Sequence, residues 1–494
     1  MFFAGNYKSG NDLQQIMLNQ FEVEETVYSV VSDLQNAGYE TYIVGGAIRD
    51  LLLNRTPKDY DISTSATPEE IRAVFGRRRA RIIGKRFQLV HVRCGKELFE
   101  VSTFRRAPAE KSHEPQTPGA QKIAALEEAE NMIFNDNDFG TSEEDAWRRD
   151  FTVNALFYDP VSDELIDYTG SGIADIESGL VRAIGDPKLR FEEDPVRMLR
   201  ALKLVGQYGF KLERKTEDAL RSTLPLLELA SVSRLSLELE KILNSSYTGS
   251  ILQAVADYGL LRYFLPNLAK KNEQHNLKLS LQLLQKRDQR VAAGYYRNSA
   301  SLAMAALALP FIDSMIDGNY RRNFAQNSTD PLPLPDEWDD DMIRQALLAV
   351  YQPLAIIKRL SCSACRMLAI QPLLFGKLPP KRLVRLRGFA HAMELFKIQC
   401  EVGYLQCSDE FISMWRDTIA KFGGVNHLEK SAQNSDNDFS QSNSGKRRRS
   451  NRRRRSNRQH KNTYDQHAEN TPENNEKLIK QQQHAAADDL KLGF

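Results

Sequence analysis

Two aspartates separated by one residue, Asp59 and Asp61, are the residues of this sequence best suited to metal chemistry. They lie in the segment DYDIST, whose alternating pattern predicts a strand over 59–64. Because alternate residues of a strand project to one face, the two carboxylates would stand side by side. Two adjacent negative charges favour a hard divalent cation such as Mg²⁺, which binds carboxylate oxygens and keeps positions for phosphates. A pair of turn aspartates without a ligand is the alternative.

A pair of glycines lies shortly upstream of these acids. The segment VGGAIRD places Gly45 and Gly46 between a short β-branched strand, TYIV at 41–44, and an apolar helical run. Glycines let backbone N–H groups approach an anion closely, and a helix N-terminus adds its dipole. Arg49, in the first helical turn, can bind a phosphate with its two-pronged guanidinium. A phosphate cradle directly before a strand with two acids predicts a nucleotide-binding site.

A third carboxylate for the metal site is available at two positions. Glu100 lies in the segment LFEVSTF, an expected strand, and Asp150 follows two arginines in the segment RRD. Glu100 could join the metal site from a neighbouring strand, whereas an ion pair that anchors a turn is the alternative for Asp150. The spacing alone leaves both assignments open.

The segment EDPVRMLR, at 193–200, could read a nucleotide base. Asp194 and Pro195 make an ordinary helix start, with the aspartate as N-cap and the proline as first helical residue. Asp194 and Arg197 are also three residues apart, so both can reach one face near the helix N-terminus. A carboxylate accepts a hydrogen bond from the adenine N6 amino group and a guanidinium donates one to N1, so such a pair could select ATP without a template. Position alone leaves both interpretations open.

Together these segments resemble the class II nucleotidyltransferases of the DNA polymerase β superfamily. The matching motifs, in order, are VGGAIRD, DYD, IIGKRF, EVSTFRR, RRDFTVNAL and EDPVRMLRA, within residues 40–225. The class contains CCA-adding tRNA nucleotidyltransferases and bacterial poly(A) polymerases. Gln88-Leu89, where CCA-adding enzymes carry a smaller pair, and an arginine-rich C-terminal segment resemble the polymerases. A CCA-adding enzyme is the alternative, and a non-catalytic RNA-binding scaffold is the alternative of another class.

The resemblance implies a role for each motif residue. Asp59, Asp61 and Glu100 would hold two Mg²⁺ ions, and Asp150 matches the aspartate commonly counted as the third catalytic acid. The implied activity is the template-independent transfer of AMP from ATP to RNA 3′ ends, by a poly(A) polymerase acting in RNA processing and decay. The residues implied to bind ATP are Gly45, Gly46, Arg49, Arg149, Asn154, Asp194, Arg197 and Arg200.

The charge of the chain is distributed unevenly. The net charge is +2, but ten Lys or Arg and no acid fall between Lys446 and Lys461. Taking these ten from the 67 basic residues leaves 57 against 65 acidic ones, a net charge of −8. A concentrated basic segment on a mildly acidic body indicates a polyanionic partner, here RNA; a solubilising or targeting run is the alternative. The residues expected to bind RNA are Lys446, Arg447, Arg448, Arg449, Arg452, Arg453, Arg454 and Arg455.

The sequence predicts an α+β nucleotidyltransferase head, with a polymerase β-like mixed sheet and helices, followed by all-α domains and a disordered basic C-terminal tail. A length of 494 residues requires more than one domain. No apolar run is long enough to span a membrane. Five cysteines without a secretory signal favour the cytoplasm, and we expect a monomer. The expected boundaries are 1–22 for an N-terminal extension, 23–160 for the catalytic domain, 161–225 for a helical neck that binds nucleotide and RNA, 226–428 for an all-α body with an RNA-binding domain, and 429–494 for the tail.

The hydrophobic pattern also predicts the elements that position the motifs in the head. The expected helices cover 23–37 and 68–75, the expected strands cover 41–44, 59–64, 81–83, 89–92 and 98–104, and a long loop is expected over 105–142.

Overall fold

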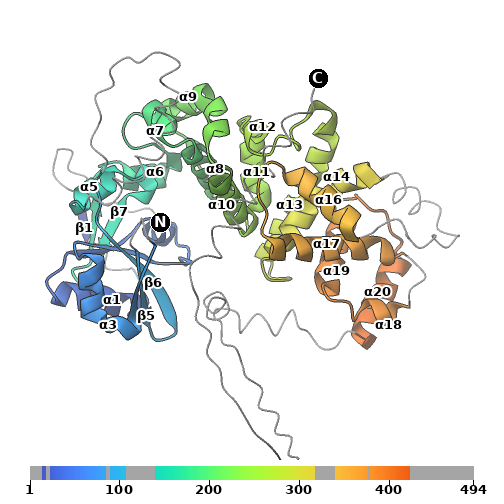
Figure 1. Cartoon of the computed structure of the whole chain (residues 1–494), viewed down its shortest axis with the longest axis horizontal. Helices are drawn as coiled ribbons and strands as arrows, with labels where there is room; N and C mark the ends of the chain where they lie inside the picture. The colour runs from blue at the N-terminus through green and yellow to red at the C-terminus, as the bar shows by residue number, and fades with distance from the viewer. Residues whose placement is uncertain are drawn as a thin grey trace, which may run out of the picture. The chain divides into compact units, whose positions relative to one another are not determined.

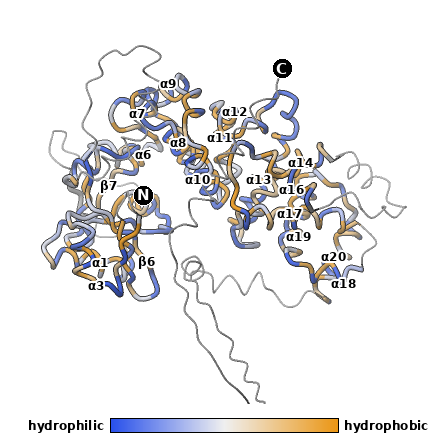
Figure 2. Tube along the Cα trace, in the orientation of Figure 1, coloured by the Kyte–Doolittle hydropathy of each residue, from blue (hydrophilic) through white to orange (hydrophobic). Residues whose placement is uncertain are grey.

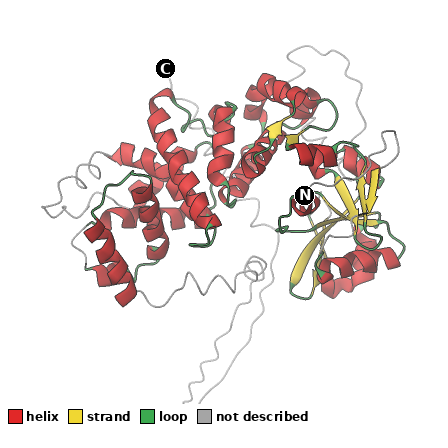
Figure 3. Cartoon of the chain, turned by 180° about the vertical axis from the view of Figure 1, so that it is seen from behind, coloured by secondary structure: helices red, strands yellow, loops and turns green. Residues whose placement is uncertain are grey.

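The computed structural model describes residues 14–17, 23–84, 89–106, 139–316, 340–375 and 379–422. The strands gather in the N-terminal part and helices make up most of the remainder (Figures 1 and 3). This arrangement confirms the predicted α+β head followed by all-α domains. The predicted RNA-binding residues 446–455, and the Gln88 at which the resemblance favours a polymerase, lie outside the described residues.

One mixed sheet organises the head. Its strands follow the order β1-β8-β7-β2-β3-β6-β5-β4. β3 and β6 pair in parallel, and the other neighbours in the sheet pair antiparallel. The strands are β1 (Gln14–Met17), β2 (Thr41–Val44), β3 (Asp61–Thr64), β4 (Ala80–Ile83), β5 (Leu89–Cys94), β6 (Glu97–Thr103), β7 (Leu156–Asp159) and β8 (Glu164–Asp167).

Helices α1 (Glu25–Asn36) and α3 (Pro68–Arg79) cover one face of this sheet (Figure 1). The strand residues that point to them, including Ile62, Val90 and Val101, are fully buried. Helix α3 begins where predicted, because Thr67 and Glu70 form a capping box around Pro68 at the first turn.

The opposite face of the sheet carries Val44, Asp61, Ser63 and Glu100, and we call it the site face. A second apolar cluster covers one end of this face, where α5 (Ser142–Trp147) packs through Ala146. The carboxylates of the site face remain outside that cluster, so the sheet separates a dry side from a chemically accessible one.

Three boundaries differ from the sequence predictions. β3 begins at Asp61, so Asp59 precedes the strand instead of opening it. The sheet continues past residue 160, because β8 forms a hairpin with β7 and belongs to the head and not to the helical neck. β1 lies in the predicted N-terminal extension and pairs with β8 at the edge of the sheet. The place of β1 depends on pairing between distant segments, which periodicity does not reveal, whereas the hairpin of β7 and β8 is a local pairing.

The neck follows the sheet. It comprises α6 (Gly172–Ser178), β9 (Leu180–Val181), α7 (Pro187–Glu193), α8 (Val196–Tyr208), β10 (Lys211–Leu212) and α9 (Arg214–Thr223), and β9 and β10 form a separate two-stranded sheet. Helix α2 (Gly46–Leu52) connects the head to the neck through side-chain contacts with α8.

The helical body packs directly on the neck. A Cβ at Gly206 of α8 would collide with the backbone of Ile251 on the helix at 248–257, so these two helices pack with their backbones in close contact. Hydrophobic and hydrophilic stretches alternate along the helices (Figure 2). Among the described residues, no helix is long and apolar enough to cross a membrane. The body helices are α10 (Val232–Leu243), α11 (Thr248–Asp257), α12 (Leu261–Phe264), α13 (Gln274–Ala292), α14 (Ala300–Ile316), α16 (Asp340–Tyr351), α17 (Lys358–Leu373), α18 (Pro380–Leu383), α19 (Phe389–Glu401) and α20 (Asp409–Phe422).

Candidate active site

Asp61 and Glu100 stand directly opposite each other on the site face. The parallel pairing of β3 with β6 places these two residues in register. Desolvation by the surrounding protein raises the pKa of Asp61, although the residue keeps an exposed surface. The negative charges of Glu100 and Asp59 raise this pKa further, and Arg149 opposes the rise. Two strands therefore hold like charges close together.

Asp59 belongs to the same acidic group although it lies outside the strand. Tyr60, between the two aspartates, is 8% exposed and points into the core, which leaves Asp59 and Asp61 on the outside. The side chain of Asp59 is exposed, and its Oδ2 lies 3.9 Å from Nζ of Lys58. The buried tyrosine, and not a longer strand, therefore turns both aspartates away from the core, and their joint binding of a metal stays a prediction.

The acidic group fits a divalent cation in charge and in donor chemistry. Asp59, Asp61 and Glu100 offer carboxylate oxygens alone, the donors that Mg²⁺ prefers. Desolvation and the charges of Glu100 and Asp59 together raise the pKa of Asp61, and a bound cation would favour its charged form. Within the described ranges, no three His, Cys, Asp or Glu side chains are already arranged to hold a metal ion. The carboxylates would therefore have to turn toward the ion as it binds.

The glycine pair gives room to two guanidinium groups. Gly45 adopts a φ of 75°, which residues with a side chain rarely adopt. A Cβ at Gly45 would lie 3.3 Å from Nη1 of Arg149, and a Cβ at Gly46 would lie 3.2 Å from Nη2 of Arg49. The close approach predicted for a phosphate is thus made here by the protein's own cations.

Arg149 is the cation of this pair that reaches the site face. Its Nη2 lies 2.8 Å from Oδ2 of Asp145 and 3.4 Å from Oγ of Ser63, two residues along β3 from Asp61. Asp145 is fully buried, and although burial alone would raise its pKa, Arg149 and Arg148 hold that pKa below its usual range. The buried aspartate therefore fixes the guanidinium beside the acidic group.

Arg49 is buried and turns toward the neck. Its guanidinium donates to Asp50, to the Asn154 side chain and to the hydroxyl of Tyr208 on α8, and it lies 4.4 Å from the centre of the Tyr208 ring. Tyr208 in turn donates to Asp50 at 2.7 Å. This closed set of contacts joins α2 to α8, and the predicted contact of Arg49 with a phosphate stays a prediction.

Asp150 lies apart from the acidic group and faces the neck. Its Oδ1 accepts hydrogen bonds from the backbone N–H of Phe151 and from Asn154, and its Oδ2 lies 3.6 Å from Nη1 of Arg200. The charges that act on Asp61 include Glu100 and not Asp150. Of the two candidate third acids, the structure brings Glu100 to the predicted metal ligands.

Asp194 and Arg197 contact different partners. Asp194 accepts from Arg234 of α10 at 2.6 Å, and its other oxygen accepts from the backbone N–H of Val196 at the start of α8. Arg197 donates to Glu193 and to the carbonyl of Arg190. The expected helix start differs by one residue, because Pro195 and not Asp194 is the N-cap of α8, which begins at Val196. The two side chains proposed to read a base are each held by an ion pair.

Several residues around the site could not be selected from the sequence. Arg190 donates to the carbonyls of Arg148 and Arg149, and so fixes the turn that carries Arg149 and Asp150. Glu238 of α10 is buried among Arg200, Lys203 and Lys241. Both depend on contacts with distant segments. The contact of His91 with Glu100, whose Nε2 and Oε1 lie 3.5 Å apart, could have been predicted from the sequence. The two-residue Gly95-Lys96 turn sets the register of β5 with β6, and that register places the two residues opposite each other.

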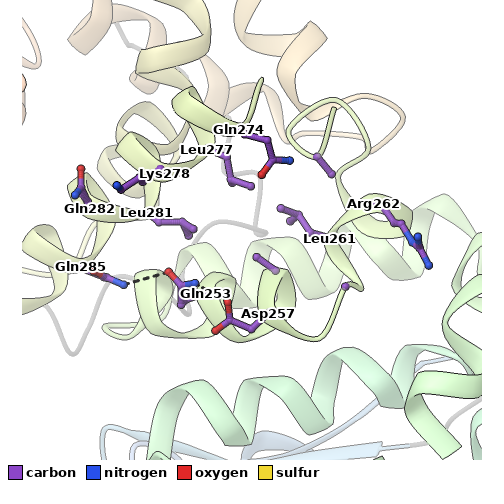
Figure 4. Close-up of a pocket in the computed structure, with 13 residues that line it drawn as sticks. Gln253, Asp257, Leu261, Arg262, Gln274, Leu277, Lys278, Leu281, Gln282 and Gln285 are labelled. Carbon is purple, nitrogen blue, oxygen red and sulfur yellow. Dashed lines mark hydrogen bonds between the residues drawn. The ribbon is translucent and has the colours of Figure 1, made fainter. Parts of the chain in front are cut away.

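A cavity of about 490 Å³ lies elsewhere, among α11, α12 and α13 (Figure 4). Its lining includes Asp257, Lys278 and Gln253, and Gln253 accepts a hydrogen bond from Gln285 at 3.4 Å. None of the residues predicted to act on nucleotide or metal lines it. The candidate active site is therefore the accessible sheet face and not this cavity.

The comparisons with protein families match this arrangement of head and neck. Residues 41–182 match the family model described as "Poly A polymerase head domain". Residues 209–272 match the model described as "Probable RNA and SrmB- binding site of polymerase A". The first range contains the acidic group and Arg149, and it ends before Asp194.

Curated relatives carry two different names. A protein of Haemophilus influenzae named "Poly(A) polymerase I" is 38% identical over 308 residues, 60% of this chain and 66% of the relative. A protein of Bacillus licheniformis named "CCA-adding enzyme" is 38% identical over 245 residues, 50% of this chain and 56% of the relative. The chain thus spans 66% or less of the length of these relatives.

A solved structure supports the fold. The protein described as "tRNA-processing enzyme (apo form I)" superposes with a TM-score of 0.53 over 84% of this chain and 97% of its own length. Its sequence is 21% identical. The likeness therefore extends through the sheet, the neck and much of the helical body.

Proposed function

We propose that this chain, which belongs to the bacterial poly(A) polymerase and tRNA nucleotidyltransferase family, adds AMP from ATP to RNA 3′ ends without a template. The observation that carries the proposal is the acidic group on the site face. Asp59, Asp61 and Glu100 crowd together beside the fixed guanidinium of Arg149. A stable fold gains nothing from such repulsion, whereas phosphoryl chemistry requires carboxylates for cations and a cation for the phosphates.

In the proposed reaction, the 3′-hydroxyl oxygen of RNA forms a bond with the α-phosphorus of ATP. The bond between that phosphorus and the bridging oxygen breaks, pyrophosphate leaves with the electron pair, and the hydroxyl proton passes to solvent. Divalent cations held by Asp59, Asp61 and Glu100 would, when bound, neutralise charge on the triphosphate and lower the pKa of the hydroxyl. Arg149 would bind triphosphate oxygens, because Asp145 already holds its guanidinium in place.

The neck residues would bind the nucleoside part of ATP. Asp150 and Asn154, hydrogen-bonded to each other, would face the ribose, and Arg200 would accompany them. For Asp194 to accept from the adenine amino group, it would exchange its contact with Arg234 for the base. Such an exchange would couple ATP binding to the packing of α10 on α8. The complete set proposed for ATP is Gly45, Gly46, Arg49, Arg149, Asn154, Asp194, Arg197 and Arg200.

RNA would contact the arginine-rich segment through its phosphates. The ten basic residues between Lys446 and Lys461 provide a sequence-independent attraction for RNA. We extend the proposal to RNA processing and decay in the cytoplasm, since the relatives named "Poly(A) polymerase I" are the ones that match over the longer part of the chain.

CCA addition is the second candidate. The "CCA-adding enzyme" of Bacillus licheniformis is as identical to this chain, over fewer residues, as the polymerase of Haemophilus influenzae. The two activities share the acidic group and differ in nucleotide and in RNA. A CCA-adding enzyme would use CTP as well as ATP and would require a tRNA.

One experiment separates these activities. The purified protein is incubated with Mg²⁺ and each NTP singly, on an oligoadenylate and on a tRNA that lacks its terminal CCA. The expected result is long addition from ATP on both RNAs and poor use of CTP. Addition of two C residues and one A, confined to the tRNA, would replace the first proposal by the second. No incorporation of any nucleotide would remove both and leave a non-catalytic RNA-binding protein.

A further inference from the structure

Four residues stand directly opposite one another across the site face. Pairing of β4 with β5 aligns Arg81 with His91, pairing of β5 with β6 aligns His91 with Glu100, and pairing of β6 with β3 aligns Glu100 with Asp61. Directly opposed residues of a sheet project to the same face. We call Arg81, His91, Glu100 and Asp61 the cross-strand row.

Burial confirms which face the row occupies. Its neighbours along the strands, Val90, Val92 and Val101, are fully buried under α1 and α3, so the row projects the other way. Adjacent strands lie about 4.8 Å apart, so the row extends over about 14 Å from the sheet edge to the acidic group.

The row carries opposite charges at its two ends. Arg81 lies on β4, the edge strand, and is exposed, as is Arg93, two residues along β5 from His91 and on the same face. Neither guanidinium has a hydrogen-bond or ion-pair partner among the residues that the structure describes. Their charges are therefore available to an external anion, while Asp61 and Glu100 close the other end of the row.

The acidic group thus lies between two separate sets of cations. Arg149 approaches Asp61 from the β2 side of β3, where it touches Ser63 and the backbone at Gly45. Arg81 and Arg93 lie beyond Glu100, on the β4 and β5 side. A reaction that joins two phosphate-bearing substrates needs two such places. Arg149 is assigned to the triphosphate under the proposed function, so the second place is left for the RNA.

We propose that Arg81 and Arg93 form a subsite for backbone phosphates of the RNA strand whose 3′-hydroxyl reacts at Asp61 and Glu100. This inference rests on the proposed function and gives the RNA a direction on the site face. Phosphates bind the cationic end of the row and are repelled from the acidic end. The uncharged hydroxyl terminus can approach the carboxylates, so the strand runs from the β4 edge toward β3 with its 3′ end leading.

The other reading of these arginines is protection of the sheet edge. Charged side chains on an edge strand hinder pairing with a second chain. That reading explains Arg81 on β4 but not Arg93, because β5 is paired on both sides. It also predicts aggregation, and no loss of RNA affinity, when the charge is altered.

The test measures RNA binding without catalysis. Anisotropy of a labelled oligoadenylate with a 3′-deoxy end gives its Kd for the full chain and for the double variant Arg81→Glu with Arg93→Glu. We expect Kd to rise at least tenfold and the log–log salt slope to flatten by about 1.4, since single strands give about 0.7 per phosphate contact. The conservative pair Arg81→Lys with Arg93→Lys should restore most of the affinity.

The matched control is Lys96→Glu, an exposed charge reversal at the β5–β6 turn. Lys96 lies three residues along the chain from Arg93, about 10 Å at the strand rise and beyond the roughly 8 Å screening length at physiological salt. It should change RNA affinity less than twofold. An equal loss in Lys96→Glu would overturn the subsite in favour of a diffuse field over the head. Unchanged Kd and salt slope in the double variant would overturn it in favour of edge protection.

Steady-state kinetics keep this inference separate from the proposed function. If the wild-type protein incorporates AMP and the double variant keeps the wild-type KM for RNA, the subsite is wrong and the function stands. Suppose that the wild-type protein incorporates no nucleotide and that the double variant binds RNA more weakly than the wild type. The arginines then bind RNA as proposed, and the proposed function is wrong. When both hold, the KM for RNA rises and the KM for ATP stays unchanged, and unchanged thermal unfolding confirms that the variant is folded.

Discussion

Carboxylates gather on the site face of the sheet and at the contact between the neck and α10, and the surroundings of these two groups differ. On the site face, desolvation raises the pKa of Asp61, and the nearby charges of Glu100 and Asp59 raise it further. Where α10 of the body packs on α8 of the neck, Asp194 and Glu238 are enclosed by arginines and lysines, which lower the pKa of Glu238.

The difference separates a site prepared for a ligand from a network that stabilises packing. Unrelieved repulsion is retained where an external cation relieves it, whereas mutually satisfied charges can hold α8 against α10 without any ligand. Substitutions in the first region should therefore reduce activity and leave the fold intact. Substitutions in the second should act first on stability.

The largest effect is expected at Asp61. Asp61→Asn should lower the rate of AMP incorporation at least 10²-fold, as loss of a catalytic group usually does. Its thermal midpoint should not fall, because the charge that is removed is repelled by Glu100 and Asp59. Single-turnover incorporation and thermal unfolding measure the two properties. The same change at the exposed Asp218 is the control. A variant that keeps more than about a tenth of the rate would contradict the assignment of Asp61 as a metal ligand. It would also contradict the distinction between a ligand site on the site face and packing charges elsewhere.

The second test removes the negative charge of Glu238, which joins the ion pairs between α10 and the neck. Glu238 is 3% exposed and lies 2.8 Å from Lys241 and 3.4 Å from Lys203. Glu238→Gln leaves Lys203 without its charge partner, whereas the exposed Lys241 stays solvated, so the free energy of unfolding at neutral pH should fall by about 1–3 kcal/mol. Denaturant unfolding measures the loss, and Glu228→Gln, at an exposed position, is the control.

The pH dependence of this stability has a definite sign. Burial alone would raise the pKa of Glu238, but Lys203, Lys241 and Arg200 hold it below the ordinary value of about 4.3. Its stabilising contribution is therefore complete at neutral pH and is lost as the pH falls below about 4 through the folded-state pKa. The gap between wild type and Glu238→Gln should narrow over that acidic range. If the difference in unfolding free energy between the two proteins stays constant, packing and not charge stabilises the contact between α10 and the neck.

Nucleotide choice is expected to change by a smaller factor. Asp194→Ala should reduce the preference for ATP over the other NTPs by roughly 5- to 150-fold, the 1–3 kcal/mol that a well-placed polar pair contributes to base discrimination. Relative kcat/KM for the four NTPs measures it. Arg234→Ala is the matched variant, because it removes the partner of Asp194 and keeps the carboxylate. Equal loss of preference in both would place Asp194 among the packing charges. Retained preference in Asp194→Ala would mean that the base is read elsewhere.

Local pattern predicted much of the head from sequence. The strand TYIV, the helix that begins at Pro68 and the strands around His91 and Glu100 follow from periodicity and capping, because those signals are contained in a few consecutive residues. The order of the strands did not follow. β3 pairs with β6 and β2 pairs with β7 across long intervening segments, and no local signal encodes that choice.

The same limit applies to the candidate site. The identity of Asp59 and Asp61 as a pair of outward-facing acids could be predicted, since residue type and strand alternation suffice. The surroundings of Arg49 could not, because Tyr208 lies more than 150 residues away and decides that the guanidinium is buried. Choosing Glu100 over Asp150 as the acid beside Asp61 likewise required the register of two strands.

The basic segment from Lys446 to Lys461 is a third charged region, and its charges are all positive. Its removal is expected to have the smallest effect of the changes considered. The basic residues from Lys446 to Lys461 contain no acid, so they neither repel a cation site nor satisfy one another. A protein shortened from Ser444 should keep its kcat and its KM for ATP, because the sheet and the acidic group of the head are built from residues upstream of 168. Its KM for a short oligoadenylate should rise at moderate salt.

Four phosphate contacts at about 0.7 counterions each give a log–log salt slope of about −3, which the shortened protein would lose. Measuring that KM at two salt concentrations, with and without the segment, decides between RNA binding and a solubilising role. Parallel salt slopes in the two proteins would leave Arg81 and Arg93 as the arginines proposed to bind the substrate strand.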